Sequence, residues 1–167
     1  MRRFALLLAA SLMTGPAFAQ EPVGCDKFKW PLDREKAMLA TAAPAPSDGM
    51  IAAPLASAYK VTLAPYDSAK IPNTPSRPPK AGSMAGTVTV ASPPQAGTYK
   101  ISLDQGAWID VFQKGQEVKS GAFSGAQGCD GIRKSVKFNL AAEPLTLLIT
   151  GTTASAISFV ITTDDNK

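Results

Sequence analysis

The sequence has 167 residues, 45% of them hydrophobic, which suits a single domain with its own hydrophobic core. It carries 17 Lys and Arg, 13 Asp and Glu, and no His, so Ser-His-Asp triads, Cys-His pairs, His-ligated zinc sites and two-His-one-carboxylate iron sites are excluded. Because no cluster of basic residues with interleaved aromatics occurs, nucleic acid is not an expected partner.

Residues 1–19 have the layout of a secretory signal peptide. Arg2 and Arg3 form a basic start, an apolar run follows from Phe4 to Met13, and residues 17–19 are an Ala-Phe-Ala cleavage site. The apolar run is shorter than the roughly 20 residues that span a bilayer, which disfavours the alternative of a membrane anchor. We therefore expect a periplasmic or secreted protein without a membrane span. Removing the leader leaves 15 basic and 13 acidic residues, a nearly neutral chain.

The two cysteines, Cys25 and Cys129, have one possible pairing with each other. In an oxidising compartment we expect a structural disulfide that fixes the N-terminal segment to the loop at residues 128–131. Three alternatives are less favoured: a reactive thiol, a metal site, and lipidation of Cys25. Two widely spaced cysteines without His make a poor ligand set, and Cys25 lies well beyond the apolar run.

Residues 20–50 are predicted to be an N-terminal segment with one short helix between Trp30 and Ala43. Pro31 suits a first helical position, and the acids Asp33 and Glu35 suit a first helical turn. Ten of the 14 prolines follow between Pro44 and Pro94, which excludes a long helix there.

Residues 51–167 are predicted to form a β-sandwich domain that includes a Pro-rich connection at residues 64–82. Short runs with alternating apolar residues or β-forming composition predict eight strands, at residues 59–63, 87–91, 98–103, 107–113, 117–123, 135–140, 145–150 and 156–162. The connections are too short for crossover helices, so the sequence predicts an all-β, antiparallel sandwich of jelly-roll or Greek-key type.

The predicted core consists of one side of each well-alternating strand. Its members are Val88, Val90, Tyr99, Ile101, Leu103, Val136, Phe138, Leu140, Leu145, Leu147, Ile149, Ile157, Phe159 and Ile161. The opposite side of residues 135–140 is polar and is expected to face solvent.

Trp108, Asp110 and Phe112 are the candidate ligand-binding residues. They alternate with the apolar Ile109 and Val111, so two aromatic rings and a carboxylate share one face of a predicted strand, an arrangement that suits sugars. The alternative is a structural role, in which the N-terminal helix or the Pro-rich connection covers this face and backbone N–H groups bind Asp110. Trp30 is expected to belong to the same cover.

The other polar residues do not identify a further functional site. A catalytic carboxylate pair is disfavoured because several of the acids lie in turns. A Ser124 nucleophile is disfavoured because the G-x-S-x-G elbow is absent. Arg133 and Lys134 are more simply charged residues at the entry of a strand than a contact for an acidic partner. No metal or cofactor is predicted; Ca²⁺ bound by loop carboxylates is the alternative. The acids considered are Asp104, Asp110, Glu117, Asp130 and Glu143 for catalysis, and Asp104, Asp130, Asp164 and Asp165 for Ca²⁺.

Two resemblances add to these expectations. Residues 96–103 and 107–111, with 138–140 and 145–151, resemble exported pre-peptidase C-terminal and carbohydrate-binding sandwich modules, which implies that fold. Residues 25–32 and 122–136 resemble a family of small exported bacterial proteins whose function is not settled, some of which carry the name homogentisate 1,2-dioxygenase. The enzyme of that name resembles a longer cupin with His and carboxylate iron ligands, and this chain has no His.

The sequence therefore predicts a non-catalytic exported binding or accessory module of the bacterial envelope. A glycan is the first expected ligand. The alternative is a protein-interaction or structural role with an envelope protein as partner, and a carboxylate-based enzyme comes third.

Overall fold

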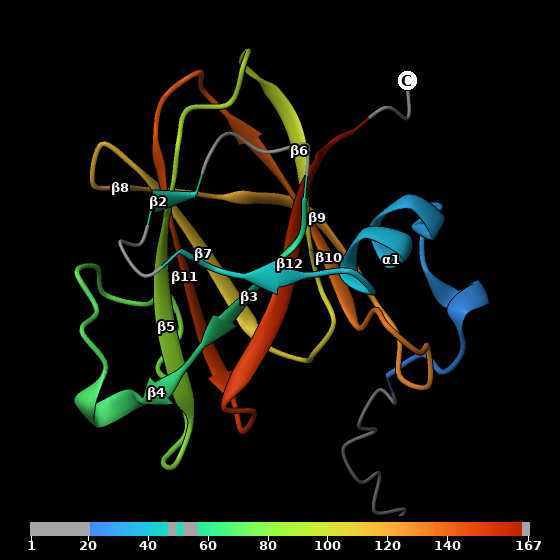
Figure 1. The fold of residues 1–167 in the computed structure, drawn as a ribbon, viewed down its shortest axis with the longest axis horizontal. Helices are drawn as coiled ribbons and strands as arrows, with labels where there is room; N and C mark the ends of the chain where they lie inside the picture. Colours follow the sequence, from blue (N-terminus) through green and yellow to red (C-terminus); the bar gives the residue numbers. More distant parts are fainter. Residues whose placement is uncertain (1–20, 47–49, 52–56, 165–167) are drawn as a thin grey trace, which may run out of the picture.

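The computed structural model describes residues 21–46, 50–51 and 57–164, in which two mixed β-sheets and one α-helix are formed (Figure 1). The predicted signal peptide lies outside these residues. The helices are α1 (Asp33–Leu39) and the short 3-10 helices η1 (Cys25–Lys27) and η2 (Tyr66–Ser68). The described strands are β1 (Ala43–Pro44), β2 (Met50–Ile51), β3 (Tyr59–Thr62), β4 (Ala64–Pro65), β5 (Met84–Val90), β6 (Gly97–Leu103), β7 (Trp108–Gln113), β8 (Gln116–Val118), β9 (Ser120–Gly125), β10 (Lys134–Leu140), β11 (Leu145–Thr152) and β12 (Ala156–Thr163).

The first sheet has the strand order β1-β3-β12-β6-β10-β9, and the second has the order β2-β5-β11-β7-β8 with β4 also paired to β5. All long strands pair antiparallel, as their short connections predict. The sheets are nevertheless mixed, because the two-residue strands β1 and β2 add in parallel to β3 and β5. Neither of these short strands was predicted.

Side chains from both sheets meet in one hydrophobic core. All fourteen residues predicted for the interior are buried in it, from Val88 on β5 to Ile161 on β12. Alternation identified them because successive side chains of a strand point to opposite faces of its sheet.

The helix α1 covers the outer face of the first sheet, where it lies beside β12 (Figure 1). Leu32 and Leu39 are buried there against Val160 and Ile132. Glu35 is buried as well: its Oε1 atom lies 2.9 Å from Lys100 Nζ and accepts a hydrogen bond from Thr162 Oγ1 at 2.5 Å. A charged pair therefore crosses the apolar contact between helix and sheet.

The structure corrects three expectations. The helix is shorter than residues 30–43, since it begins at Asp33 and the chain extends into β1 after Leu39. The predicted strand at residues 117–123 is two strands, β8 and β9, which lie in different sheets and meet at Lys119. The outer face of β10 is partly covered, because Trp30 Nε1 donates a hydrogen bond to the buried Ser135 at 3.2 Å.

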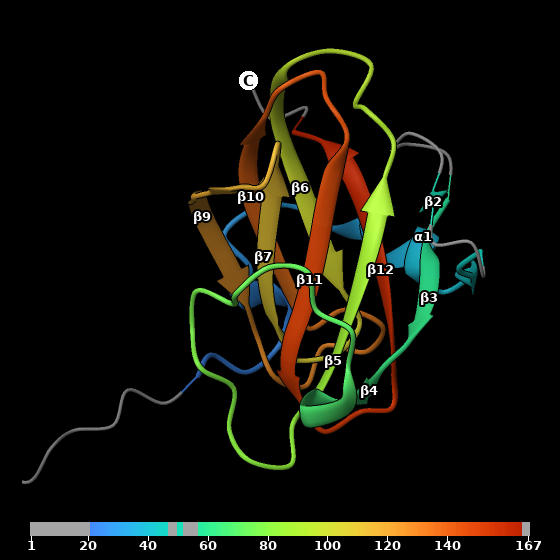
Figure 2. The same cartoon turned by 90° about the vertical axis from the view of Figure 1, so that its left-hand side faces the viewer.

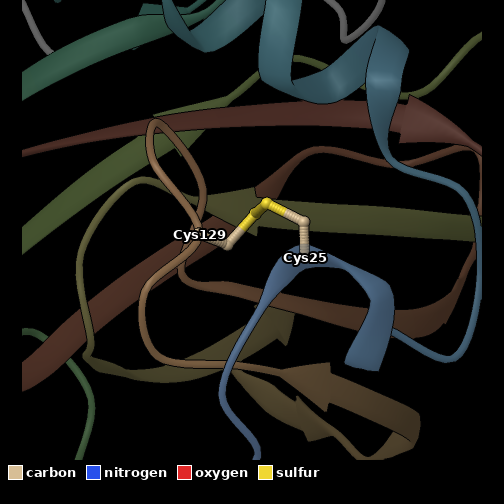
Figure 3. Close-up of a disulfide and its surroundings, with 2 residues drawn as sticks. All are labelled: Cys25 and Cys129. Carbon is tan, nitrogen blue, oxygen red and sulfur yellow. A yellow bond between two sulfur atoms is a disulfide. The ribbon is translucent and has the colours of Figure 1, made fainter.

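The predicted disulfide between Cys25 and Cys129 is present. It joins the N-terminal segment to the loop between β9 and β10 (Figure 3). Together with the burial of α1, it holds the N-terminal segment on the first sheet. No helix among the described residues has the length and apolar character of a membrane span.

Candidate functional site

A groove of about 820 Å³ lies between the Pro-rich connection and the ends of four strands, β7, β9, β10 and β11. Its walls come from residues 21–22, 77–80, 106–109, 120, 123, 125, 133–134, 136 and 150–151. This volume falls within the range of small-ligand sites, roughly 300 to 1,000 Å³. Figure 2 shows the Pro-rich connection, the green loop between β4 and β5, in front of β7 and β11.

Trp108 lies at the start of β7 and lines the groove with its side chain partly exposed. Its indole Nε1–H donates to Ser76 Oγ and to Asp110 Oδ1, both at 3.0 Å. Because the polar atom of the ring is bonded within the protein, what Trp108 offers a ligand is the part of its apolar ring that neighbouring side chains leave exposed.

Asp110 and Phe112 do not line the groove; both are buried. The Pro-rich connection reaches Asp110, whose Oδ2 accepts the backbone N–H of Ser76 at 3.2 Å and whose Oδ1 accepts the Ser76 hydroxyl. These contacts agree with the alternative in which the Pro-rich connection covers this face of the strand and a backbone N–H group binds Asp110. Of the three predicted ligand-binding residues, the structure leaves only Trp108 partly exposed, while Trp30 packs on the other sheet instead of joining this cover.

Cationic side chains surround Trp108. The Arg77 guanidinium lies 5.3 Å from the ring centroid, and Lys134 Nζ lies 4.9 Å from it. Both distances are within the range of cation–π interactions. Lys134 Nζ also donates to the carbonyl of Ala107 at 2.9 Å. Burial, with repulsion from Arg133 and Arg77, lowers the pKa of the Lys134 ammonium below its ordinary 10.5.

Among the described residues, one carboxylate, that of Glu21, reaches the groove. The Oε2 atom of Glu21 accepts a hydrogen bond from Gln127 Nε2 at 2.8 Å and forms an ion pair with Arg133. The backbone holds Glu21 there, since Gln127 N donates to the carbonyl of Pro22 and Gly24 N donates to that of Gln127, both at 2.8 Å. These contacts fix the chain immediately before η1.

The hydrogen bond from Gln127, with the charge of Arg133, lowers the pKa of Glu21 below its ordinary 4.5. The Glu21 contacts therefore stabilise the folded chain above pH 4.5, and this contribution is lost as the pH falls through the folded-state pKa. We expect Gln127→Ala to raise the pKa of Glu21 toward 4.5 in an NMR titration, whereas Gln105→Ala, an exposed control, leaves it unchanged. A Glu21 that titrates at its ordinary pKa in the unaltered protein would contradict these contacts.

Phe123 on β9 is the second aromatic residue of the groove and is 61% exposed. Lys29 Nζ lies 5.0 Å from its ring centroid. The neighbouring Ser124 is buried and its Oγ accepts the backbone N–H of Lys29 at 2.8 Å, so its hydroxyl helps to hold the N-terminal segment.

Besides Asp110, four of the carboxylates considered for catalysis or Ca²⁺ form separate local contacts, while Asp130 is exposed in the loop between β9 and β10. Asp104 accepts the backbone N–H of Ser158 at 2.8 Å, and Asp164 pairs with Lys137 at 2.6 Å. Glu117 and Glu143 form exposed ion pairs with lysines. Within residues 21–46, 50–51 and 57–164, no three His, Cys, Asp or Glu side chains are grouped to hold a metal ion; Asp165 lies outside them.

Sequence reasoning identified Trp108 but missed Glu21, Arg77 and Phe123 as parts of one site. They come from three segments far apart in the chain, and nothing in their spacing shows that they meet. Arg133 and Lys134 were considered only as a surface for an acidic partner. The contact of Lys134 with Trp108 joins the start of β10 in the first sheet to the start of β7 in the second, so it depends on how the two sheets pack.

Comparison of the chain with protein-family models, with curated proteins and with solved structures finds no match.

Proposed function

We propose that the protein is a non-catalytic, exported binding module of the bacterial envelope that holds a glycan in the groove at Trp108. The observation that carries this proposal is the partly exposed indole, whose N–H is already bonded, at the wall of a groove large enough for a few sugar rings. Sugars stack their C–H faces on such rings and place their hydroxyls toward polar groups at the rim.

The surroundings of Trp108 support the proposal. Phe123 adds a second exposed ring, and Pro22, Pro78 and Pro79 add rigid apolar surface. The groove is lined by one carboxylate of the described residues, Glu21, whereas glycoside hydrolysis ordinarily requires two facing ones. Binding without catalysis accounts for this composition.

Export is supported by two features. The first 19 residues have the pattern of a signal peptide, and the disulfide suits an oxidising space outside the cytoplasm. We further propose that the two sheets form a sandwich of jelly-roll or Greek-key type, related to carbohydrate-binding and pre-peptidase C-terminal modules. We also propose that the chain is related to the family of small exported bacterial proteins that its residues 25–32 and 122–136 resemble.

A thermal-shift screen of the oxidised chain from residue 20 onward tests glycan binding. A ligand at 100 times its Kd adds about 2.7 kcal/mol of stability, or roughly 5 to 10 °C. We expect such a shift with at least one of a panel of neutral oligosaccharides, acidic oligosaccharides and peptidoglycan fragments. Trp108→Ala should remove the shift, and Trp30→Phe, outside the groove, should keep it. A full shift in folded Trp108→Ala protein would contradict the proposed site.

A second candidate function rests on the edge of the first sheet. β9 is the terminal strand, and its residues 120–123 are exposed, so a partner strand has backbone groups to pair with. In this case a photo-crosslinker at Ala122 should capture one dominant envelope protein. The same crosslinker at the exposed Lys114 serves as the control, and equal capture at both positions would argue against the edge.

A further inference from the structure

We infer that the groove selects acidic glycans and that Glu21 of the chain itself occupies the place of the ligand carboxylate in the unliganded protein. This inference rests on the proposed function and names the ligand class for the same site. Its occupant is a saccharide that carries carboxylate groups, such as a uronic acid oligomer.

The contacts of Glu21 show how the groove receives a carboxylate. Its Oε2 atom takes one hydrogen bond from the Gln127 amide and one charged contact from the Arg133 guanidinium. Arg133 can bind a carboxylate with two parallel N–H groups, which makes it the residue type suited to this ligand. Because the Glu21 side chain is 57% exposed, an incoming carboxylate can displace it from Arg133 at little cost while the backbone stays in place.

Besides the contact between Glu21 and Arg133, the net positive charge of the groove also favours an anionic ligand. In the part of the chain that the structure describes, Arg77, Lys80, Arg133 and Lys134 line it, against one acid, Glu21. Lys134 is also partly desolvated and lies in the repulsive field of two arginines. A bound carboxylate would relieve that repulsion, whereas a neutral sugar would not.

Hydrogen-bonding capacity points in the same direction. Asp110 is the acceptor that a neutral sugar would need beside Trp108, yet its two oxygens already receive Ser76 and the indole N–H. The charged side chains left at the rim are mainly donors. A groove that combines hydrogen-bond donors with aromatic rings suits a sugar that carries a carboxylate, because the carboxylate accepts hydrogen bonds from those donors.

Calorimetric titration with matched ligands tests the inference. The probes are hexamers of galacturonate, of alginate uronates and of hyaluronan, each with its methyl ester, which removes the charge and keeps the sugar. We expect at least one acid to bind about tenfold more tightly than its ester at low salt, with the difference shrinking as salt is added. Arg133→Gln should remove most of the difference.

Variants of Glu21 provide the second arm. Glu21→Gln removes the internal competitor, so the acidic hexamer should bind about two- to fivefold more tightly, while its ester is unaffected. Glu117→Gln, which removes an acid outside the groove, is the matched control and should change neither affinity.

The outcomes separate the two levels of the proposal. Equal binding of acid and ester, both lost in Trp108→Ala, would overturn the acidic preference and leave glycan binding standing. If no acid, ester or neutral oligosaccharide binds, both are overturned. Weaker binding of the acid to Glu21→Gln would overturn the assignment of Glu21 as a stand-in for the ligand.

Discussion

Loss of the Cys25–Cys129 disulfide is expected to lower the free energy of unfolding by about 4 to 5 kcal/mol. The bridge closes a chain segment with a sequence separation of 104, and in the chain-entropy model a loop on the order of 100 residues restricts the unfolded state by that amount. The variant is Cys25→Ser with Cys129→Ser, and the measurement is unfolding in urea. In thermal unfolding of the same variant, the midpoint temperature should fall by roughly 10 to 20 °C.

A control separates the bridge from the packing of its sulfur atoms. The unaltered protein, unfolded in the presence of a reductant, should match the double variant within about 1 kcal/mol. A double variant with nearly the stability of the oxidised protein would show that the buried face of α1, rather than the bridge, holds the N-terminal segment.

Replacing Glu35 by Ala is expected to destabilise the protein by about 3 to 5 kcal/mol. Glu35 and Lys100 have side chains 1% and 8% exposed, so the substitution leaves an ammonium buried without its partner. It also removes the acceptor of the Thr162 hydroxyl. Urea unfolding measures the loss, and Asp33→Ala, an exposed acid on the same helix, should cost about 1 kcal/mol or less.

The double variant Glu35→Leu with Lys100→Met distinguishes a lost charge pair from a disrupted helix. Apolar residues of similar size often replace a buried ion pair without cost, so most of the stability should return. A double variant as unstable as Glu35→Ala would contradict the electrostatic explanation and indicate a packing defect beneath α1.

The core was predictable from sequence because alternate side chains of a strand point to the same face of its sheet, so alternating apolar residues mark the buried face. Tyr99, Ile101 and Leu103 alternate along β6, and all three are buried between the sheets. The break at Lys119 was not predictable, since no Gly or Pro marks the point where the chain passes from the second sheet to the first. Burial of Glu35 was missed because an acid in a first helical turn is equally suited to solvent.

The candidate site was predictable only in part. Trp108 was singled out by its aromatic and acidic neighbours on one strand face, but Asp110 is covered by Ser76, 34 positions earlier in the chain. Local alternation reports which face a residue occupies and not what covers that face. The same limit applies to Glu21 and Arg133, which meet through a backbone bridge between Val23 and Gln127.

The two tryptophans provide the most direct test of ligand binding in the groove at Trp108. Trp108 lines the groove, while Trp30 donates its indole N–H to Ser135 on the other sheet. In an NMR titration of the oxidised protein with a uronate hexamer, the Trp108 indole N–H signal should shift and saturate while the Trp30 signal stays in place. Movement of the Trp30 signal alone, or no change in either signal with any acidic or neutral oligosaccharide at millimolar concentration, would contradict ligand binding in this groove.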